Sequence, residues 1–373
     1  KKKAWREQQI RLVQASEPTL QTIHLHSSEV ADADVAALAA ALETNAVVQR
    51  VALWQNKLSS LSGAPLGAML AANHTLTVLD LHGNELGAAG AAALARGLEC
   101  NAALTSLNLA RNKLQAAGVR EVARGLRRNQ ALVELDLSLN SMGDEGAAAL
   151  ARAVRVNRSL ARLSLRHNEI GSRGAQVLAA ALGANNGTLN TLHLAHNAVG
   201  DLGARALAPL GLAHLDLADN RVGVRGARSL AAALRGPHSP VRLSLDANNI
   251  GAEGACELAL ALRVNTVLTS LSLTGNDVGS KGAQALADAL ETNTTVTSLG
   301  LFDHGSRAVP VLAAIRQRLR ANQERKIVLR RMLTLCLAGR RRRRRQAESG
   351  QPRTYPRLPV EICRLIVDEF VHQ

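Results

Sequence analysis

Three histidines, His167, His193 and His196, are the residues of this sequence whose type and spacing come closest to a metal site. Imidazole nitrogens are common zinc ligands. These three, however, follow the period of a repeat described below, which would set them on rows about 5 Å apart. We therefore expect them to be exposed to solvent, and we expect no metal site.

Other signatures of catalysis are not found in the sequence. It contains no Walker phosphate loop, no HExxH and no GxSxG motif. Its glycine pairs, such as Gly87 with Gly90 and Gly143 with Gly146, recur at the repeat period and are therefore interpreted as turn residues. We expect neither enzymatic activity nor a bound cofactor.

The four cysteines, Cys100, Cys256, Cys336 and Cys363, show no CxxC spacing. They indicate neither a disulfide framework nor a zinc site, which is typical of a reducing compartment inside the cell. No apolar run reaches the roughly 18 residues that a membrane span requires. We expect a cytoplasmic or nuclear protein without a transmembrane segment.

A short phrase, LxLxxN, organises most of the chain. Its steps are 28, 28, 28, 28, 29, 23, 28 and 28 residues, and degenerate copies at Ser28 and His304 extend the series to eleven. The asparagines that mark the phrase are Asn56, Asn84, Asn112, Asn140, Asn168, Asn197, Asn220, Asn248 and Asn276. We interpret them as structural residues that satisfy backbone groups where each strand ends.

Each copy combines two hydrophobic periods. The LxL part alternates and predicts a short strand, whereas the following Ala/Leu segment has apolar residues at i, i+3 and i+4 and predicts a helix of about three turns. Strands pack about 4.8 Å apart and helices about 8–10 Å apart. Stacked copies must therefore bend into an arc with the strands inside.

The segment LTVLDLHGNELGAAGAAALARGLECN at Leu76–Asn101 resembles the ribonuclease-inhibitor type of leucine-rich repeat. This repeat occurs in ribonuclease inhibitor, NOD-like receptors and the Ran GTPase-activating protein. Over Leu20–Asn322 the resemblance implies an α/β, right-handed solenoid, or horseshoe, with parallel strands on the concave face and helices on the convex face. It also implies protein binding through the concave face or its rim. The nucleotide-binding domain of the receptors and the acidic tail of the Ran activator are missing, so neither specific role follows.

The candidate binding surface is the concave face. The residue between the two leucines and those just after the second vary from copy to copy, while the leucines do not. The alternative is a solvated surface that binds nothing. The candidates for protein binding are Trp54, Asp80, His82, Arg111, Asp136, Arg166, His193, Asp216, Asp246 and Phe302.

One copy is short by five residues, between Asn197 and Asn220, and contains Pro209 where other copies continue a helix. We predict that this helix ends early. The deletion is either simply tolerated, or it produces a kink that alters the curvature or opens a notch on the convex side.

The predicted organisation has five parts. Residues 1–19 form a basic N-terminal segment, 20–322 the solenoid, 323–339 a C-terminal cap, 340–357 an arginine-rich linker and 358–373 an amphipathic helix. Residues 20–304 carry 23 basic and 23 acidic residues, so the net charge of +15 resides at the two ends. A general argument for nucleic-acid binding from the whole-chain charge therefore fails.

The basic run comprises Arg340, Arg341, Arg342, Arg343, Arg344 and Arg345. It is a solvated linker, a nuclear localisation signal, or a weak contact for nucleic acid or an anionic membrane. Few aromatic residues lie nearby, so any nucleic-acid binding would be unspecific and sensitive to salt. The basic amphipathic stretch Ile315–Leu337 could touch a membrane, but we expect it to close the stack.

The final segment, LPVEICRLIVDEF, resembles the opening of an F-box, with matches at Leu358, Pro359, Glu361, Ile362, Ile366 and Phe370. The resemblance implies docking to a Skp1-type adaptor, although F-boxes usually precede the repeats. The alternative is a helix that packs back on the stack. We predict a monomeric scaffold for an unidentified protein partner, with a ubiquitin-ligase substrate receptor and a nucleic-acid or lipid binder as alternatives.

Overall fold

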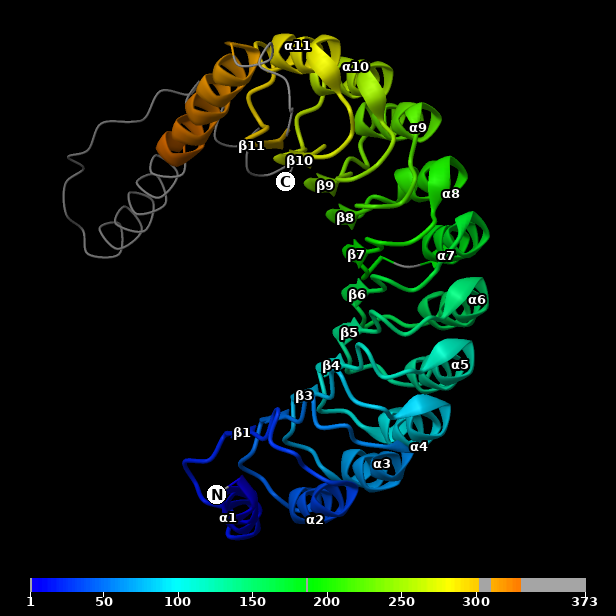
Figure 1. The fold of residues 1–373 in the computed structure, drawn as a ribbon, viewed down its shortest axis with the longest axis vertical. Helices are drawn as coiled ribbons and strands as arrows, with labels where there is room; N and C mark the ends of the chain where they lie inside the picture. The colour runs from blue at the N-terminus through cyan, green and yellow to red at the C-terminus, as the bar shows by residue number, and fades with distance from the viewer. Residues whose placement is uncertain (1, 186, 302–309, 330–373) are drawn as a thin grey trace, which may run out of the picture.

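The computed structural model describes residues 2–185, 187–301 and 310–329. Eleven three-residue strands form one open parallel sheet, in which each strand pairs with the next along the chain. The strands line the inside of an arc and the helices its outside (Figure 1). The strands are β1 (Thr22–His24), β2 (Arg50–Ala52), β3 (Val78–Asp80), β4 (Ser106–Asn108), β5 (Glu134–Asp136), β6 (Arg162–Ser164), β7 (Thr191–His193), β8 (His214–Asp216), β9 (Arg242–Ser244), β10 (Ser270–Ser272) and β11 (Ser298–Gly300).

A helix precedes β1, and another follows each strand in the described residues; the one after β11 covers residues 310–329. The predicted solenoid is thereby confirmed. The labelled helices are α1 (Lys2–Gln14), α2 (Asp32–Glu43), η1 (Ser60–Ser62), α3 (Gly63–Ala72), α4 (Gly87–Cys100), α5 (Gln115–Leu126), α6 (Gly143–Val154), α7 (Ser172–Asn185), α8 (Gly200–Leu207), η2 (Ala208–Leu210), α9 (Val224–Leu234), α10 (Gly251–Leu262) and α11 (Gly279–Ala289).

The two leucines of each LxL phrase point into the core. Leu135 pairs in register with Leu107 and Leu163, and it is 2% exposed. Leu137, the second leucine of the same copy, is fully buried, whereas Asp136 between them is partly exposed. Side chains of a strand alternate between its two faces, so the predicted division into a buried and an open face is confirmed.

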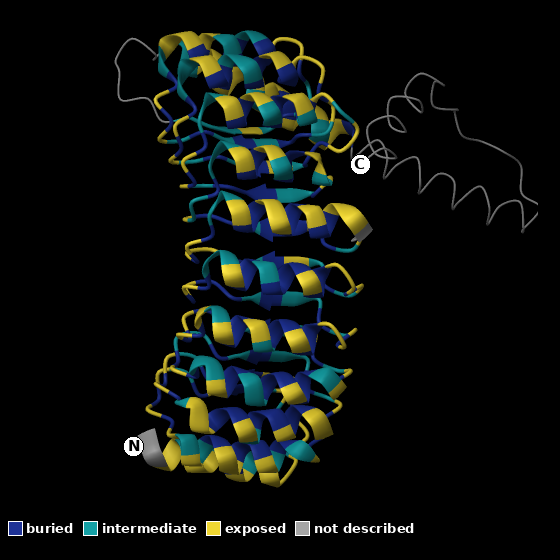
Figure 2. Ribbon diagram, turned by 90° about the vertical axis from the view of Figure 1, so that its right-hand side faces the viewer, coloured by how far each residue is buried: buried dark blue, intermediate teal, exposed yellow. Residues whose placement is uncertain are grey.

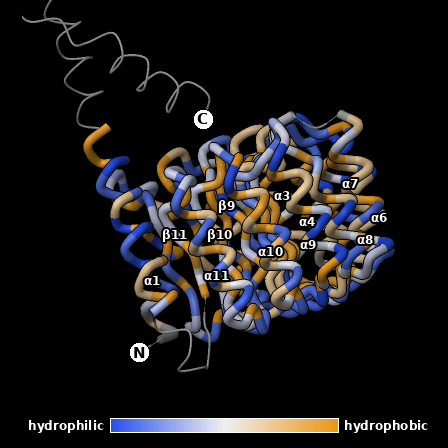
Figure 3. The backbone as a smooth tube through the Cα atoms, turned by 90° about the horizontal axis from the view of Figure 1, so that it is seen from above, coloured by the Kyte–Doolittle hydropathy of each residue, from blue (hydrophilic) through white to orange (hydrophobic). Residues whose placement is uncertain are grey.

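Small residues allow neighbouring helices to approach closely. A Cβ atom on Gly97 of α4 would overlap the carbonyl oxygen of Gly67 on α3. Buried and exposed positions alternate on the outer helices (Figure 2), and both hydrophobic and hydrophilic residues occur around the coils (Figure 3). Within the described residues, the core is therefore a stack of thin layers rich in Leu, Val and Ala, with no large aromatic side chain among its buried members.

The asparagines of LxLxxN form a ladder along the stack. Asn140 Nδ2 donates to the carbonyl oxygens of Leu109 (2.9 Å) and Leu137 (3.0 Å). Its Oδ1 accepts from the backbone N–H groups of Asn112 (2.9 Å) and Leu114 (3.2 Å). Eight of the nine predicted asparagines are buried, and Asn197 is partly buried. The structural role predicted for them is confirmed.

A second asparagine ladder follows the helices, and the sequence analysis did not predict it. Asn129 Nδ2 donates to the carbonyl oxygens of Leu98 (2.9 Å) and Asn101 (2.8 Å), and its Oδ1 accepts from the N–H of Leu132 (2.8 Å). Buried asparagines at corresponding positions are Asn45, Asn73, Asn101, Asn157, Asn265, Asn293 and Asn322. Repeats that carry this second asparagine are thus joined to their neighbours at both ends of the strand–helix unit.

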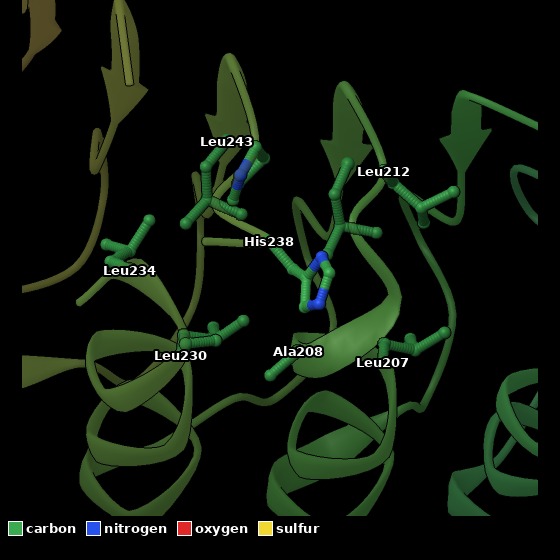
Figure 4. Close-up of a pocket in the computed structure, with 10 residues that line it drawn as sticks. Leu207, Ala208, Leu212, Leu230, Leu234, His238 and Leu243 are labelled. Atoms are coloured by element: carbon green, nitrogen blue, oxygen red, sulfur yellow. The ribbon is translucent and has the colours of Figure 1, made fainter. Parts of the chain in front are cut away.

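The short repeat behaves as predicted at its helix. α8 ends at Leu207, η2 carries Pro209, and Gly211 turns the chain with a φ of 64°. His238 of the next repeat lies against the shortened segment, between Leu212 and Ala208 (Figure 4). The cavity left there measures about 10 Å³, which is room for about one water molecule. Side chains of the neighbouring repeat line this small space, as expected for a deletion that is simply tolerated.

The two ends of the core are covered by helices. In α1, Ile10 and Val13 are buried, and the carbonyl oxygen of Val13 accepts from Asn45 Nδ2 (3.0 Å). The basic N-terminal segment is therefore largely a helix that caps the core. The sequence analysis did not predict this helix, because the segment was described by its charge alone. At the other end, Asn322 donates to the carbonyl oxygen of Asn293 (3.0 Å), so residues 310–329 continue the stack. The rest of the predicted cap, the linker and the last helix lie outside the described residues.

Candidate binding site on the concave face

Three columns of side chains cover the inner face of the sheet. The sequence analysis identified two of them, formed by the residues between the leucines and after the second leucine. The strand register adds a third, formed by the residue before the first leucine. We call it the outer column, and its members are Thr22, Arg50, Val78, Ser106, Glu134, Arg162, Thr191, His214, Arg242, Ser270 and Ser298.

The predicted binding residues are distributed over this face. Arg111 lies in the turn after its strand, where its φ is 53° and its side chain is exposed. Phe302 lies outside the described residues. The predicted residues on or directly after the strands are Trp54, Asp80, His82, Asp136, Arg166, His193, Asp216 and Asp246. Of these, the structure brings Arg166, His193 and Asp216 into direct contact.

These three residues border a recess of about 610 Å³ over β6 to β10, which we call the central recess. Its outer wall comes from residues that the sequence analysis missed, and small side chains of β9 and β10 leave the space open. The alternation of the strands would have found them, because the positions before and between the leucines share one face. The lining residues are Arg162, Arg166, Asn190, Thr191, His193, Ala213, His214, Leu215, Asp216, Arg242, Leu243, Ser244, Ser270 and Ser272.

Asp216 is the anionic centre of the recess. Arg166 Nη2 lies 2.5 Å from its Oδ2, and His193 Nδ1 lies 3.5 Å from the same oxygen. Burial would raise the pKa of Asp216, but hydrogen bonds from His193, the Ala218 N–H and Arg166, with the charge of Arg166, lower this pKa to about 2. The carboxylate is therefore ionised at neutral pH, and its charge is matched by Arg166.

The outer wall of the recess is basic. Arg162 forms an ion pair with Glu134 of the preceding strand. His214 of β8 stands directly beside Arg242 of β9 in the strand register. Burial lowers the pKa of His214, and the charges of Arg242 and His193 lower it further. With neutral histidines, three arginines and one aspartate give the lining a net charge of +2.

The three histidines that suggested a metal site do not form one group. The rings of His167 and His196 stack with centroids 3.9 Å apart, and His196 Nδ1 lies 2.8 Å from Asp219 Oδ2. His193 turns instead toward Asp216. His167 and His196 are exposed, as predicted. In the described residues, no group of three or more His, Cys, Asp or Glu side chains is placed to hold a metal ion.

An aromatic cluster occupies the N-terminal end of the concave face. The rings of His26 and Trp54 are stacked, with centroids 4.2 Å apart and an interplanar angle of 4°. His24 meets His26 edge to face at 6.0 Å. Trp54, predicted as an interface anchor, is therefore already partly covered by a histidine of the preceding repeat. The face thus differs along its length, with aromatic rings at one end and charged side chains near the middle.

The remaining predicted sites concern the ends of the chain. The F-box-like residues and the basic run lie outside the described residues, so docking to an adaptor, nucleic acid or a lipid surface stays a prediction. Among the helices of residues 2–185, 187–301 and 310–329, none has the length and apolar character needed to span a bilayer.

The register, the two ladders and the concave recess define a parallel strand–helix solenoid built from one repeated unit. A family described as leucine-rich repeat matches the chain at residues 72–95, 100–123, 128–151, 156–179, 185–208, 212–231 and 264–287. The chain is therefore built from leucine-rich repeats.

Several solved structures resemble the chain. The leucine-rich repeat-containing protein LegL7 from Legionella pneumophila has 23% identity over 73% of this chain and 90% of its own, with a TM-score of 0.48. The tropomodulin C-terminal domain from Caenorhabditis elegans has 16% identity over 40% of this chain and 90% of its own, with a TM-score of 0.35. The actin-binding site 2 of leiomodin-1 has 26% identity over 35% of this chain and 76% of its own, with a TM-score of 0.34. The comparison with curated proteins gives no match.

Proposed function

We propose that this protein is an interaction scaffold that binds a protein partner along its concave face, with the central recess as the main anchoring point. The observation that carries the proposal is the recess itself, a space of about 610 Å³ bordered by charged side chains on an otherwise regular sheet. Interface anchors are typically few, and they lie in well-formed pockets near the centre of a contact surface.

The construction of the solenoid supports this proposal. The leucines and asparagines that fix the frame are buried, so side chains on the concave face can vary without loss of the fold. A curved sheet surrounds a partner on more than one side and enlarges the contact area. Leucine-rich-repeat proteins are generally scaffolds of this kind, and catalysis is not required to explain the recess.

The proposal can be tested by filling the recess. We suggest Ser244→Trp combined with Ser272→Trp, because both side chains lie on the strands at the recess. A matched control places the same bulk on the convex face, with Ala232→Trp in α9 and Leu260→Trp in α10, where both positions are exposed. Tagged versions of wild type and both variants would be purified from cells, and the bound proteins identified by mass spectrometry.

We expect the recess variant to lose specific partners that wild type and the convex variant retain. Circular dichroism and thermal unfolding must show that both variants stay folded. Retention of every partner by the folded recess variant, with losses in the convex variant, would place the binding surface on the helices and reject the proposal.

A further inference from the structure

The carboxylates near the central recess already have hydrogen-bond or ion-pair partners within the protein. Asp216 is held by Arg166 and His193, and Glu134 pairs with Arg162. Asp246, the next carboxylate along the concave face, accepts from Ser272 Oγ (2.5 Å) and from the N–H of Thr274 (2.7 Å). Within the described residues, none of these carboxylates forms a hydrogen bond or an ion pair with the two remaining basic side chains of the outer wall.

His214 and Arg242 are those two side chains. They occupy paired positions on adjacent parallel strands, and strand spacing puts their backbones about 5 Å apart. Two like charges set side by side on a sheet destabilise it. Within the described residues, neither side chain forms a hydrogen bond or an ion pair. Burial and the charge of Arg242 therefore disfavour protonation of His214 in the free protein, and an anion bound between the two side chains favours it.

The recess beside this pair has room for such an anion. Ala213, Ser244 and Ser270 are small, and they open the space in front of Arg242 and His214. The hydroxyl groups of Ser244 and Ser270 can donate further hydrogen bonds to oxygen. A guanidinium group binds carboxylate or phosphate through two parallel hydrogen bonds, and a protonated imidazole adds a third donor.

We propose that the central recess receives an acidic segment of the protein partner, with a carboxylate or phosphate group bound between Arg242 and His214. This inference rests on the proposed function and specifies the chemistry of the partner. The bound anion favours the protonated form of His214, so binding takes up a proton and strengthens as the pH falls. The charged and titratable groups of the lining around His214 are His193, Arg242, Arg162, Arg166 and Asp216.

The experiment uses three fluorescent peptides of one length and differing only at their centre, which carries glutamates, phosphoserines or glutamines. Binding to the full chain is measured by fluorescence anisotropy at about 0.15 M salt, where long-range attraction between exposed charges is screened. Arg242→Ala is compared with Arg50→Ala, which removes an exposed arginine of the same outer column on β2, far from the recess. A further variant replaces all six arginines of residues 340–345 by serine, since this run also attracts acidic peptides.

We expect the acidic peptides to bind and the glutamine peptide to bind at least about tenfold more weakly. Arg242→Ala should weaken binding of the acidic peptides about tenfold or more, while Arg50→Ala changes it less than about twofold. A change from pH 8 to pH 6 should strengthen binding about threefold or more, and His214→Gln should remove this dependence. Tighter binding of the phosphoserine peptide identifies phosphate as the ligand, and tighter binding of the glutamate peptide identifies carboxylate.

Four results would overturn the inference: no binding of either acidic peptide, equal binding of the glutamine peptide, equal losses in the two arginine variants, or binding that disappears only when residues 340–345 are changed. The proposed function is judged separately by the tryptophan variants. If those variants lose their partners while no acidic peptide binds the recess, the concave scaffold stands and the acidic ligand is rejected.

Discussion

Arg166 on the concave side of β6 meets Asp216 on β8 at 2.5 Å, although 50 residues separate them in sequence. The arginine crosses the intervening strand β7, whose His193 lies beside the contact. Three successive repeats are therefore coupled through side chains on the open face, in addition to their shared core.

This contact makes the stability of the fold depend on pH. The pKa of Asp216 is lowered to about 2, below the value of about 3.9 in an unfolded chain. Its ionised form therefore stabilises the folded state above about pH 4, and this contribution is lost as the pH falls from about 4 to about 2. Asp216→Asn should lower the free energy of unfolding at pH 7, with a difference from wild type that shrinks at pH 3. Urea unfolding at both pH values measures this, and a constant difference would mean that the carboxylate charge is unimportant.

The alternation of the strands can be tested with two neighbouring residues of β5 and its end. Leu137→Ala removes a fully buried side chain and should cost about 2–5 kcal/mol. Asp136→Ala removes an acceptor for the Ser138 N–H (2.8 Å) and should cost only about 1 kcal/mol. Chemical denaturation compares the two, and equal losses would contradict the assignment of buried and open faces.

The asparagine ladder offers a similar pair. Asn248 Nδ2 donates to the carbonyl oxygens of Leu217 (2.8 Å) and Leu245 (2.9 Å), and its Oδ1 accepts from the N–H of Val222 (2.9 Å). Asn248→Ala leaves these buried groups unpaired and should cost about 2–4 kcal/mol. Asn249 is the exposed neighbour, and Asn249→Ala should change stability by less than about 0.5 kcal/mol. Thermal and urea unfolding of both variants would show whether the buried amide has this effect.

The fold could be predicted because its main determinant is periodic. An LxL phrase with a helical segment every 28 residues leaves few arrangements that bury both apolar faces, and the register follows from the repeat. Segments outside the repeat are harder to predict, because no periodic pattern marks them. Ile10 and Val13 sit in a strongly basic stretch, so the capping role of α1 depends on two side chains and not on a pattern.

Only part of the binding site could be predicted, because strand alternation identifies the positions on the open face but not the contacts between their side chains. Asp216, His193 and Arg166 were chosen by their place in the strands, but the contact between Arg166 and Asp216 depends on how far the arginine side chain reaches across the intervening strand β7. The outer column was missed although the same alternation predicts it. Its members at the recess, among them Thr191, His214 and Arg242, show no common residue type that would have drawn attention to them.

The close approach of the helices gives a last prediction. A Cβ atom on Gly97 would overlap the backbone of Gly67, which cannot move without separating α3 from α4. Gly97→Ala should therefore cost about 1–3 kcal/mol, despite the better helix propensity of alanine. Gly183 in α7 is the matched control, because an added Cβ would meet only Leu210 Cδ2 at 3.6 Å. Gly183→Ala should be neutral or stabilising by up to about 1 kcal/mol. If both variants gain stability in thermal unfolding, α3 and α4 can accommodate the added methyl group. The packing of these helices would then not require glycine at position 97.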